Sequence, residues 1–349
     1  MRQKTREHPY RTGRIFAAVV STALVLAAVS GCSSSGPSDS GHSGASASGT
    51  SGVRTITDAT SRTVEVPAIP QRVLALSEPT LDGALALGVP VIGTTSGRGQ
   101  SGISSYLAAK AKGIPVVASV SGPNLEQVAN LKPDLILVDG TVTADEATIG
   151  KLSGIAPTVY VSKTGEDWKS AFAAEADAVG KHDAGQQVLA DYDAKVSKVK
   201  ADLGANATAT VSIVRWGSSM PSVMLKEIAA STVVSDLGLR RPPSQDKVGK
   251  GHSTPVSLEN LDQLDADWMF FGTLGGSTNP SGGNSGTSAG VADSRALLAT
   301  AEKTPGFTHL HAYQSGHVVP VDGSAWMSAG GPLAEDVVLT SIDSALGTS

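Results

Sequence analysis

One sequence pattern occurs twice in this chain, and the repetition limits the folds that the chain can adopt. The first copy covers residues 124–134 and runs into 135–138, and the second covers 257–267 and runs into 268–271. Each copy opens with Leu-Glu, places Leu five and Asp eight positions after that Glu, and ends in four apolar residues. We interpret each copy as a short amphipathic helix, a turn and a buried strand. Two such units, 133 positions apart, predict two similar lobes.

The segments around these units alternate between predicted strands and predicted helices. Short apolar runs predict strands at 72–76, 89–93, 115–117, 156–161, 210–214 and 318–321. Periodic segments predict helices at 80–87, 103–112, 226–237, 293–300 and 332–346, and residues 53–66 predict an N-terminal hairpin. This alternation indicates an α/β fold in which helices cover both faces of mainly parallel sheets.

A long helical region separates the two halves. It is predicted at 167–180 and then at 183–203, and the second piece has a helical period of apolar or aromatic residues at Val188, Leu189, Tyr192, Val196, Val199 and Leu203. At 1.5 Å per residue the second piece reaches roughly 30 Å, about the width of a small domain. Two interpretations are open, an ordinary surface helix or a rigid connector between lobes.

The first 31 residues are typical of an export signal. Basic residues up to Arg14 precede an apolar run that ends at Val29, and this run of about 15 residues is too short to span a bilayer comfortably. Residues 29–32, Val-Ser-Gly-Cys, resemble a bacterial lipobox, in which the Cys is diacylated and becomes the mature N-terminus. The alternative is a free or buried Cys32 after a plain secretory signal.

The segment that follows Cys32 cannot build a core. Residues 33–52 consist of Ser, Gly, Ala, Thr and Pro, with Asp39 and His42 as the only others. We interpret residues 32–52 as a flexible tether and His42 as a solvated residue. A signal peptide at 1–31 and a lipidated Cys32 therefore predict a protein anchored at the outer face of the cell membrane.

Charge and cysteine content exclude several classes of protein. Residues 1–31 carry a net charge of +4, so the formal charge of −5 leaves about −9 on the remainder. A nucleic-acid-binding surface would need a basic face instead. A single Cys excludes a disulfide framework and a thiolate metal cluster.

Three motifs that suggest other chemistry are weak in their context. Residues 97–102 match G-x-G-x-x-G but lie outside the first strand–helix unit and lack an acidic residue about 20 positions on, so we interpret them as a cleft loop. Residues 286–290 match G-x-S-x-G by chance in a Gly/Ser-rich tract. His309, His311 and His317 are interpreted as surface residues rather than metal ligands. No catalytic arrangement of Ser, His and Asp stands out, so we predict a protein that is not an enzyme.

Glu126 and Glu259 occupy equivalent positions in the two repeat units. Each is predicted to open a helix, where the positive end of the helix dipole stabilises a carboxylate. The dipole explains each Glu singly but not its recurrence in both halves. The recurrence fits a docking surface with two contact points better.

Several segments together resemble a known family. Residues 74–77, 85–93, 124–136 and 256–259 resemble solute-binding proteins of ferric-siderophore, haem and cobalamin ABC importers, and the likeness covers about 53–346. The resemblance implies two Rossmann-like lobes joined by one long rigid helix, with an N-terminal lobe at 53–180, the helix at 181–204 and a C-terminal lobe at 205–349. It also implies a ligand held between the lobes at strand carboxyl ends. In this family two lobe-surface glutamates pair with arginines of the permease dimer, and by motif match these are Glu126 and Glu259.

The expected ligand contacts follow from strand-end positions. Arginine suits an anionic ferric chelate and indole suits its apolar arms, and the candidates are Ser77, Glu78, Arg98, Arg215, Trp216, His252 and Trp326. Some hydroxamate-binding relatives carry an arginine just before Asn-Leu-Glu, where this chain has Val-Ser-Gly-Pro at 120–123.

The sequence therefore predicts a monomeric lipoprotein that captures a ferric siderophore and delivers it to an ABC permease dimer with its ATPase. Iron is carried within the ligand, so no protein-bound metal or cofactor is expected. A cobalamin or haem receptor is the alternative within the class, and a secreted hydrolase is the alternative outside it.

Overall fold

The computed structural model describes residues 52–119, 121–141, 145–217, 220–275, 289–328 and 330–348. They belong to one compact unit, Ser48–Ser349. The predicted signal peptide, the predicted lipidation site at Cys32 and His42 of the predicted tether lie outside the described residues. Among the helices of the described ranges, none has the length and apolar character needed to cross a bilayer.

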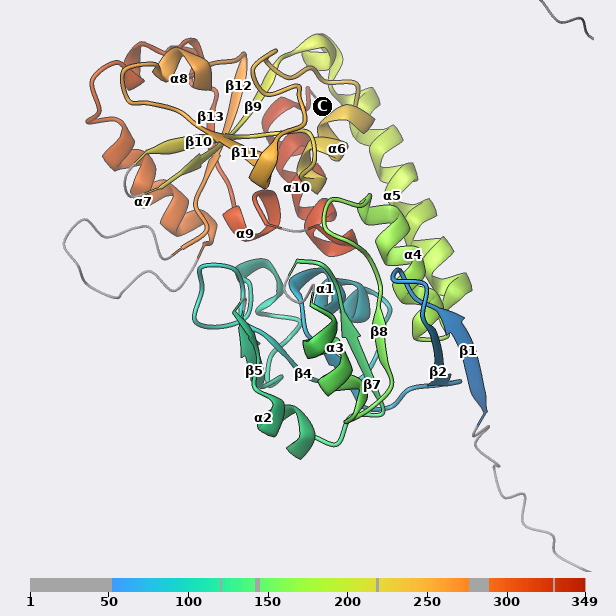
Figure 1. Cartoon of the computed structure of the whole chain (residues 1–349). Coiled ribbons are helices and arrows are strands. Elements are labelled where there is room, and N and C mark those ends of the chain that lie inside the picture. Colours follow the sequence, from blue (N-terminus) through green and yellow to red (C-terminus); the bar gives the residue numbers. More distant parts are fainter. Residues whose placement is uncertain are drawn as a thin grey trace, which may run out of the picture. The chain divides into compact units, whose positions relative to one another are not determined.

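The N-terminal half contains a two-stranded hairpin and a six-stranded sheet of order β6-β5-β4-β3-β7-β8, coloured blue to green in Figure 1. All neighbouring strands of this sheet are parallel except β5 and β6. The hairpin, five of the six sheet strands and α1 confirm the predictions, with boundaries shifted by a few residues. The strands are β1 Val53–Thr57, β2 Thr63–Pro67, β3 Val73–Ala75, β4 Val91–Thr95, β5 Val116–Ser119, β6 Gly122–Pro123, β7 Leu135–Val138 and β8 Thr158–Tyr160, and the helices are α1 Glu78–Ala86, α2 Leu125–Asn130 and α3 Glu146–Ser153.

The C-terminal half contains a five-stranded sheet of order β11-β10-β9-β12-β13. β9, β12 and β13 are parallel, whereas β10 is antiparallel to both of its neighbours, β9 and β11, so this sheet is mixed with a parallel part. The chain from β9 to β10 is too short for the crossover that a parallel pair requires, which explains the reversal. The elements are β9 Val211–Trp216, β10 Pro221–Met224, α6 Ala229–Asp236, β11 Ser253–Pro255, β12 Trp268–Gly272, α7 Val291–Ala301, α8 His311–Gln314, β13 Val318–Pro320, α9 Gly323–Trp326 and α10 Pro332–Leu346.

The predicted long helical region is two helices, α4 Trp168–Ala178 and α5 His182–Asp202. In sequence order these helices lie between the strands of the first sheet and those of the second. α5 packs against α4 and α10 (Figure 1). Tyr192, Val196 and Val199 of α5 are buried at the predicted period, and Trp168 meets Tyr192 edge-on at 4.9 Å between ring centroids. The α/β fold class is thus confirmed, whereas the exact lobe boundaries remain a prediction.

The two repeat units share their Asp but not their helix. Asp134 accepts the backbone N–H of Arg72 at 2.9 Å, immediately before β3, and Asp267 accepts that of Thr210 at 2.7 Å, immediately before β9. Each Asp precedes a central strand and fixes the start of the parallel strand beside it, which explains why Asp recurs at this place. Asn124 caps α2 in the first unit, as a helix start requires.

Two predicted helices are wrong. In the second repeat unit only a 3₁₀ turn forms, at Leu261–Leu264, and Glu259 lies in the turn before it rather than opening a helix. Residues 103–112 likewise contain only the 3₁₀ turn Ser105–Leu107. Both segments are short, and a short helix depends on packing rather than on its own propensity.

Candidate functional site

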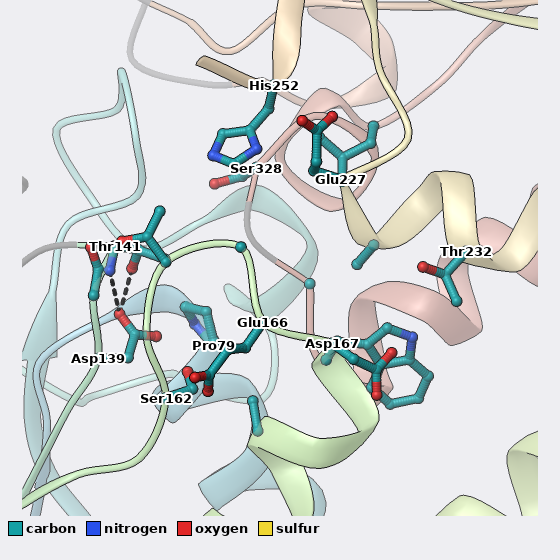
Figure 2. Close-up of a pocket in the computed structure, with 18 of the residues that line it drawn as sticks. Pro79, Asp139, Thr141, Ser162, Glu166, Asp167, Glu227, Thr232, His252 and Ser328 are labelled. Carbon is teal, nitrogen blue, oxygen red and sulfur yellow. Dashed lines mark hydrogen bonds between the residues drawn. The ribbon is translucent and has the colours of Figure 1, made fainter. Parts of the chain in front are cut away.

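A cavity of about 560 Å³ lies where strands of both sheets end. The first half contributes residues that follow β4, β7 and β8, and the second half contributes β9, the segments after β10 and before β11, and the segment after α9 (Figure 2). The ionisable lining residues are Arg98, Asp139, Lys163, Glu166, Asp167, Arg215, Lys226, Glu227 and His252. This cavity lies at strand ends, which is where the sequence analysis expected a ligand.

Asp139 is the buried acid at the end of β7. It accepts hydrogen bonds from the backbone N–H of Thr141 at 2.8 Å and from its Oγ1 at 2.5 Å, drawn in Figure 2, and from Ser77 Oγ at 2.9 Å. Burial raises the pKa of the Asp139 carboxyl, and these hydrogen bonds and the charge of Arg98 oppose the rise. Ser77 also caps α1, so it supports the cavity wall from behind and does not line the cavity.

Glu78 is a second buried acid behind the same wall. It accepts hydrogen bonds from Ser104 Oγ and from Ser328 Oγ, the latter at 2.6 Å, and Ser328 itself lines the cavity. Burial raises the pKa of Glu78, while the two hydroxyl groups and Arg98 oppose the rise. Glu78 therefore links α1 to the segment after α9 through hydrogen bonds. Glu78 does not line the cavity, whereas the next residue, Pro79, does.

Arg98 and Arg215 line the cavity as the sequence predicted. Arg98 lies in the G-x-G-x-x-G loop, where Gly99 has φ +71° and a Cβ there would overlap the carbonyl of Leu274. Glycine is therefore required by the turn and by this close approach, which supports the interpretation of a cleft loop over that of a nucleotide cradle. Arg215, near the end of β9, donates to Ser253 Oγ at 3.0 Å.

His252 also lines the cavity, and its backbone is strained. Its φ is +61°, in the left-handed region that a residue with a side chain seldom adopts. The hydrogen bond from Leu225 N–H to its carbonyl, 2.9 Å, holds this conformation. Its Nδ1 is buried without a hydrogen-bond partner among the described residues, and Figure 2 draws it with Ser328 and Glu227 among the residues that line the cavity. Strain of this kind, held by neighbours in a cavity, is common at ligand sites.

Trp216 and Trp326, the two predicted indole contacts, do not line the cavity. Trp216 packs on Phe271 and Phe307, and Trp326 is fully buried and stacks on Phe270 at 4.3 Å. Successive side chains of a strand point to opposite faces, so Trp216 turns into the core when Arg215 faces the cavity. These two tryptophans therefore belong to the hydrophobic core.

The indole that lines the cavity is Trp168, which the sequence analysis did not select. Thr141, Glu166, Glu227 and Thr232 were missed as well, and Figure 2 shows them around the cavity. Thr141, Glu166 and Glu227 follow β7, β8 and β10, whereas Trp168 begins α4 and Thr232 lies in α6. The strand-end rule would have found the residues after β7 and β8, but β10 itself was not predicted.

Glu126 and Glu259 are exposed and do not belong to the cavity lining. Glu126 lies in the first turn of α2 and Glu259 in a turn. Neither forms an ion pair with a described residue. Both carboxylates are therefore accessible on the surface.

The histidines near β13 have structural contacts. His317 stacks on Trp268 at 3.9 Å, and its Nδ1 lies 2.9 Å from the Asp267 carbonyl. The backbone N–H of His311 donates to Asp265. Within the described part of the chain, no group of three or more His, Cys, Asp or Glu residues is placed to hold a metal ion.

A family model and several known proteins match most of this chain. The family model, described as periplasmic binding protein, matches residues 77–325. The probable siderophore-binding lipoprotein YfiY of Bacillus subtilis (strain 168) is 30% identical over 298 residues, which cover 83% of this chain and 86% of YfiY. The iron(3+)-hydroxamate-binding protein FhuD of the same organism is 29% identical over 307 residues, which cover 86% of this chain and 87% of FhuD.

A solved structure shares the fold over a similar range. Staphylococcus aureus SirA, in a crystal structure with staphyloferrin B, matches with a TM-score of 0.65 at 25% identity. The match covers 83% of this chain and 96% of SirA.

Proposed function

Because this chain belongs to the periplasmic binding protein family, we propose that it captures a ferric siderophore in the cavity described above and delivers it to an ABC permease. The observation that carries the proposal is the cavity itself, which lies at strand ends and is lined by Arg98, Arg215 and Trp168. Its volume of about 560 Å³ suits a small-molecule ligand. The relatives that match over most of the chain are named for siderophore or ferric-iron binding, which supports this ligand class.

The proposal assigns binding and delivery to the chain, and no catalysis. The family is one of solute-binding proteins. The iron enters as part of the ligand, so the protein needs to recognise only the surface of the chelate. We propose that the protein acts as a monomer that hands its ligand to a permease dimer driven by an ATPase.

The proposed location is the outer face of the cell membrane. A relative that matches most of the chain is named a lipoprotein, and this chain has a lipobox-like sequence that ends at Cys32. We propose that Cys32 carries the lipid and that residues 33–52 tether the binding unit to it.

Uptake of radioactive iron by cells tests this function. A strain that lacks the chain is expected to lose uptake of one ⁵⁵Fe-labelled siderophore and to regain it when the gene for the chain is restored. Uptake of other siderophores in the same strain serves as the control. Uptake that is unchanged for every ferric siderophore would contradict the proposal.

The proposed contacts with the permease are Glu126 and Glu259. Their side chains are exposed and unpaired among the described residues, so arginines of a partner can reach both. Glu126→Lys with Glu259→Lys is expected to reduce uptake at least tenfold, because reversal of both charges turns attraction into repulsion.

The ligand affinity of this double variant is expected to stay within about twofold of the wild-type value, because neither residue lines the cavity. The exposed Glu302→Lys is the matched control and should leave uptake unchanged. A loss of ligand affinity in the double variant would instead place these residues in ligand binding.

A further inference from the structure

Arg241 is a buried cation that contacts the cavity wall but does not line the cavity. It follows α6 in the chain, is 9% exposed, and is absent from the residues around the cavity. Its guanidinium donates to the carbonyl of Met224 at 2.7 Å, to Ser231 Oγ at 2.5 Å and to Gln245 Oε1 at 2.7 Å. It forms no ion pair with a carboxylate of the described residues. All three of these acceptors are therefore neutral.

The chemistry of Arg241 does not suit a side chain that only fills the core. Burial lowers its pKa to about 10, and its Nε is buried without a hydrogen-bond partner among the described residues. The charge of Asp246 opposes the fall in pKa, but Asp246 forms its ion pair with Lys226, at 3.0 Å. An apolar side chain of similar size would fill the space without desolvating a charge. Packing alone therefore does not account for an arginine at this position.

The hydrogen bonds of Arg241 hold the chain where it leaves β10. Met224, whose carbonyl accepts from Arg241, is the last residue of β10. Ser231, the second acceptor, donates from its Oγ to the carbonyl of Leu225 at 2.8 Å. The backbone N–H of Leu225 donates in turn to the carbonyl of His252 at 2.9 Å. Two cavity-lining residues are thus connected to Arg241, Met224 directly and His252 through this chain of hydrogen bonds.

The stretch that Arg241 holds supplies much of the cavity lining from the second half of the chain. It comprises the end of β10, the connection to α6 and the first turn of α6, and two of its residues are labelled in Figure 2. Its lining residues are Met224, Lys226, Glu227, Ile228, Ala229 and Thr232. Because they follow one another in a single short stretch, a shift of its backbone displaces them together.

Gln245 connects Arg241 to the central strand β9. Its side chain is fully buried, its Oε1 accepts from Arg241, and its Nε2 donates to Ser212 Oγ on β9 at 2.8 Å. β9 also carries Arg215, which lines the cavity three residues further along the strand. The guanidinium of Arg241 is therefore held on one side by the sheet, and it holds the connection between β10 and α6 on the other.

We infer that Arg241 is a positioning residue of the ligand site. It holds the connection between β10 and α6 in the shape that fits the ligand, and Gln245 orients Arg241 for this role. The role depends on the proposed function and adds a determinant of affinity that does not touch the ligand. The acceptors of Arg241 lie on β10, on α6 and on Gln245, and a planar guanidinium reaches such a set with a fixed fork of donors, which an ammonium lacks.

Calorimetric titration of the purified full-length protein tests this role. The probes are a ferric tris-catecholate, ferric citrate and a ferric trihydroxamate, and the complex that wild type binds most tightly is used for the variants. Arg241→Met is expected to raise the Kd about tenfold or more, because small displacements of supporting residues cost a site much of its affinity. Arg241→Lys, which keeps the charge but not the fork, should give a Kd between those of wild type and Arg241→Met.

The Kd separates positioning from a purely structural role. A residue that only stabilises the fold lowers the Tm when it is replaced, but the molecules that stay folded keep their affinity. Circular dichroism and thermal unfolding therefore accompany each titration. Arg240→Met is the matched control, because Arg240 is the exposed neighbour and its side chain donates to the carbonyl of Thr208 instead. Its Kd is expected to stay within about twofold of the wild-type value.

Two further measurements address the mechanism. Gln245→Met should raise the Kd about threefold or more, and Arg241→Met with Gln245→Met should match Arg241→Met alone within about twofold, because Gln245 acts through Arg241. Amide hydrogen exchange of residues 224–232 should be faster in Arg241→Met than in wild type, whereas exchange in β7 of the first sheet should not change.

The outcomes separate the positioning role from the proposed function. If Arg241→Met folds and keeps the wild-type Kd, or if Arg240→Met weakens binding equally, the positioning role is wrong while the proposed function stands. If Arg241→Met does not fold, Arg241→Lys and Gln245→Met decide in the same way. If wild type binds none of a broad panel of ferric siderophores, the proposed function is wrong and the positioning role fails with it.

Discussion

Glu335→Gln is expected to flatten the dependence of stability on pH and to make the protein more stable than wild type at pH 8. Glu335 of α10 is fully buried, and neither of its carboxylate oxygens has a hydrogen-bond partner among the described residues. Burial raises its pKa well above 4.5, and the negative charges of Asp82 and Asp236 raise it further. A neutral amide of the same size keeps the packing and removes the ionisable group.

Asp82 is a second buried acid, and its charge acts on Glu335 and on a third buried acid, Glu175. Asp82 of α1 accepts the backbone N–H groups of Leu333 and Ala334 at 2.8 and 2.9 Å, and so caps α10 from another helix. Burial raises the pKa of Asp82 to about 7 although these hydrogen bonds oppose the rise. Glu175 of α4 is buried with one unpartnered oxygen, and burial followed by the charge of Asp82 raises its pKa well above 4.5.

The direction of the pH effect follows from these raised values. In the unfolded chain the acids release their protons near pH 4, whereas the folded protein keeps them to higher pH. The contribution of these three acids to stability is therefore fully present below pH 4 and is lost as the pH rises toward their folded-state pKa values. The pKa of Asp82 alone rises from 3.8 to about 7, which corresponds to about 4 kcal/mol in the free energy of unfolding between low pH and a pH above both values.

Urea unfolding between pH 5 and pH 8 measures this effect. Each acid that stays protonated only in the folded state lowers the free energy of unfolding by about 1.4 kcal/mol per pH unit, and Glu335→Gln should remove one such contribution. Glu65→Gln, at an exposed position on β2, is the control and should change the slope little. Equal slopes for wild type and Glu335→Gln would show that Glu335 ionises freely in the folded protein.

Gly323→Ala is expected to be among the most damaging single-methyl substitutions in the chain. Gly323 begins α9, and a Cβ there would overlap the carbonyl oxygen of Thr273 just after β12. That oxygen belongs to the backbone and cannot rotate away. Met327 and Ser328, which follow α9, line the cavity, so a displaced α9 should disturb the site as well.

The expected loss is about 3 kcal/mol or more in the free energy of unfolding, at the upper end of the cost of overpacking. Thermal unfolding should then show a fall in Tm of roughly 6 to 12 °C. Gly150→Ala is the matched control, because Gly150 lies inside α3 with nothing near its missing Cβ, and it should be neutral or stabilising by up to about 1 kcal/mol. A Gly323→Ala protein with an unchanged Tm would mean that α9 does not pack closely on β12.

The sequence predicted the fold where local pattern and tertiary packing agree. Short apolar runs bounded by Pro, Gly or Asp became the parallel strands, because a strand buried on both faces needs such a run. β10 was missed because Pro221-Ser-Val-Met is short and begins with Pro, which argues against an interior strand. The helix expected around Glu259 does not form. Its residues make only a turn and a 3₁₀ segment, because so short a helix depends on packing rather than on its own propensity.

The site was predicted in part, and the limit is the direction of side chains. Arg98, Arg215 and His252, which were chosen for their positions near strand ends, line the cavity. The same rule could not tell that Trp216 and Trp326 point into the core, because that depends on the face of each element. The buried acids Asp82, Glu175 and Glu335 carry no local signal at all, since three distant helices bring them together.

Calorimetric titration of the purified protein with ferric siderophores, the same siderophores without iron, haem and cobalamin tests the central claim most directly. The account predicts that one ferric siderophore binds with one-to-one stoichiometry and a Kd on the order of 1 µM or below, and that its iron-free form binds more weakly. Tighter binding of haem or cobalamin than of every ferric siderophore would contradict the account.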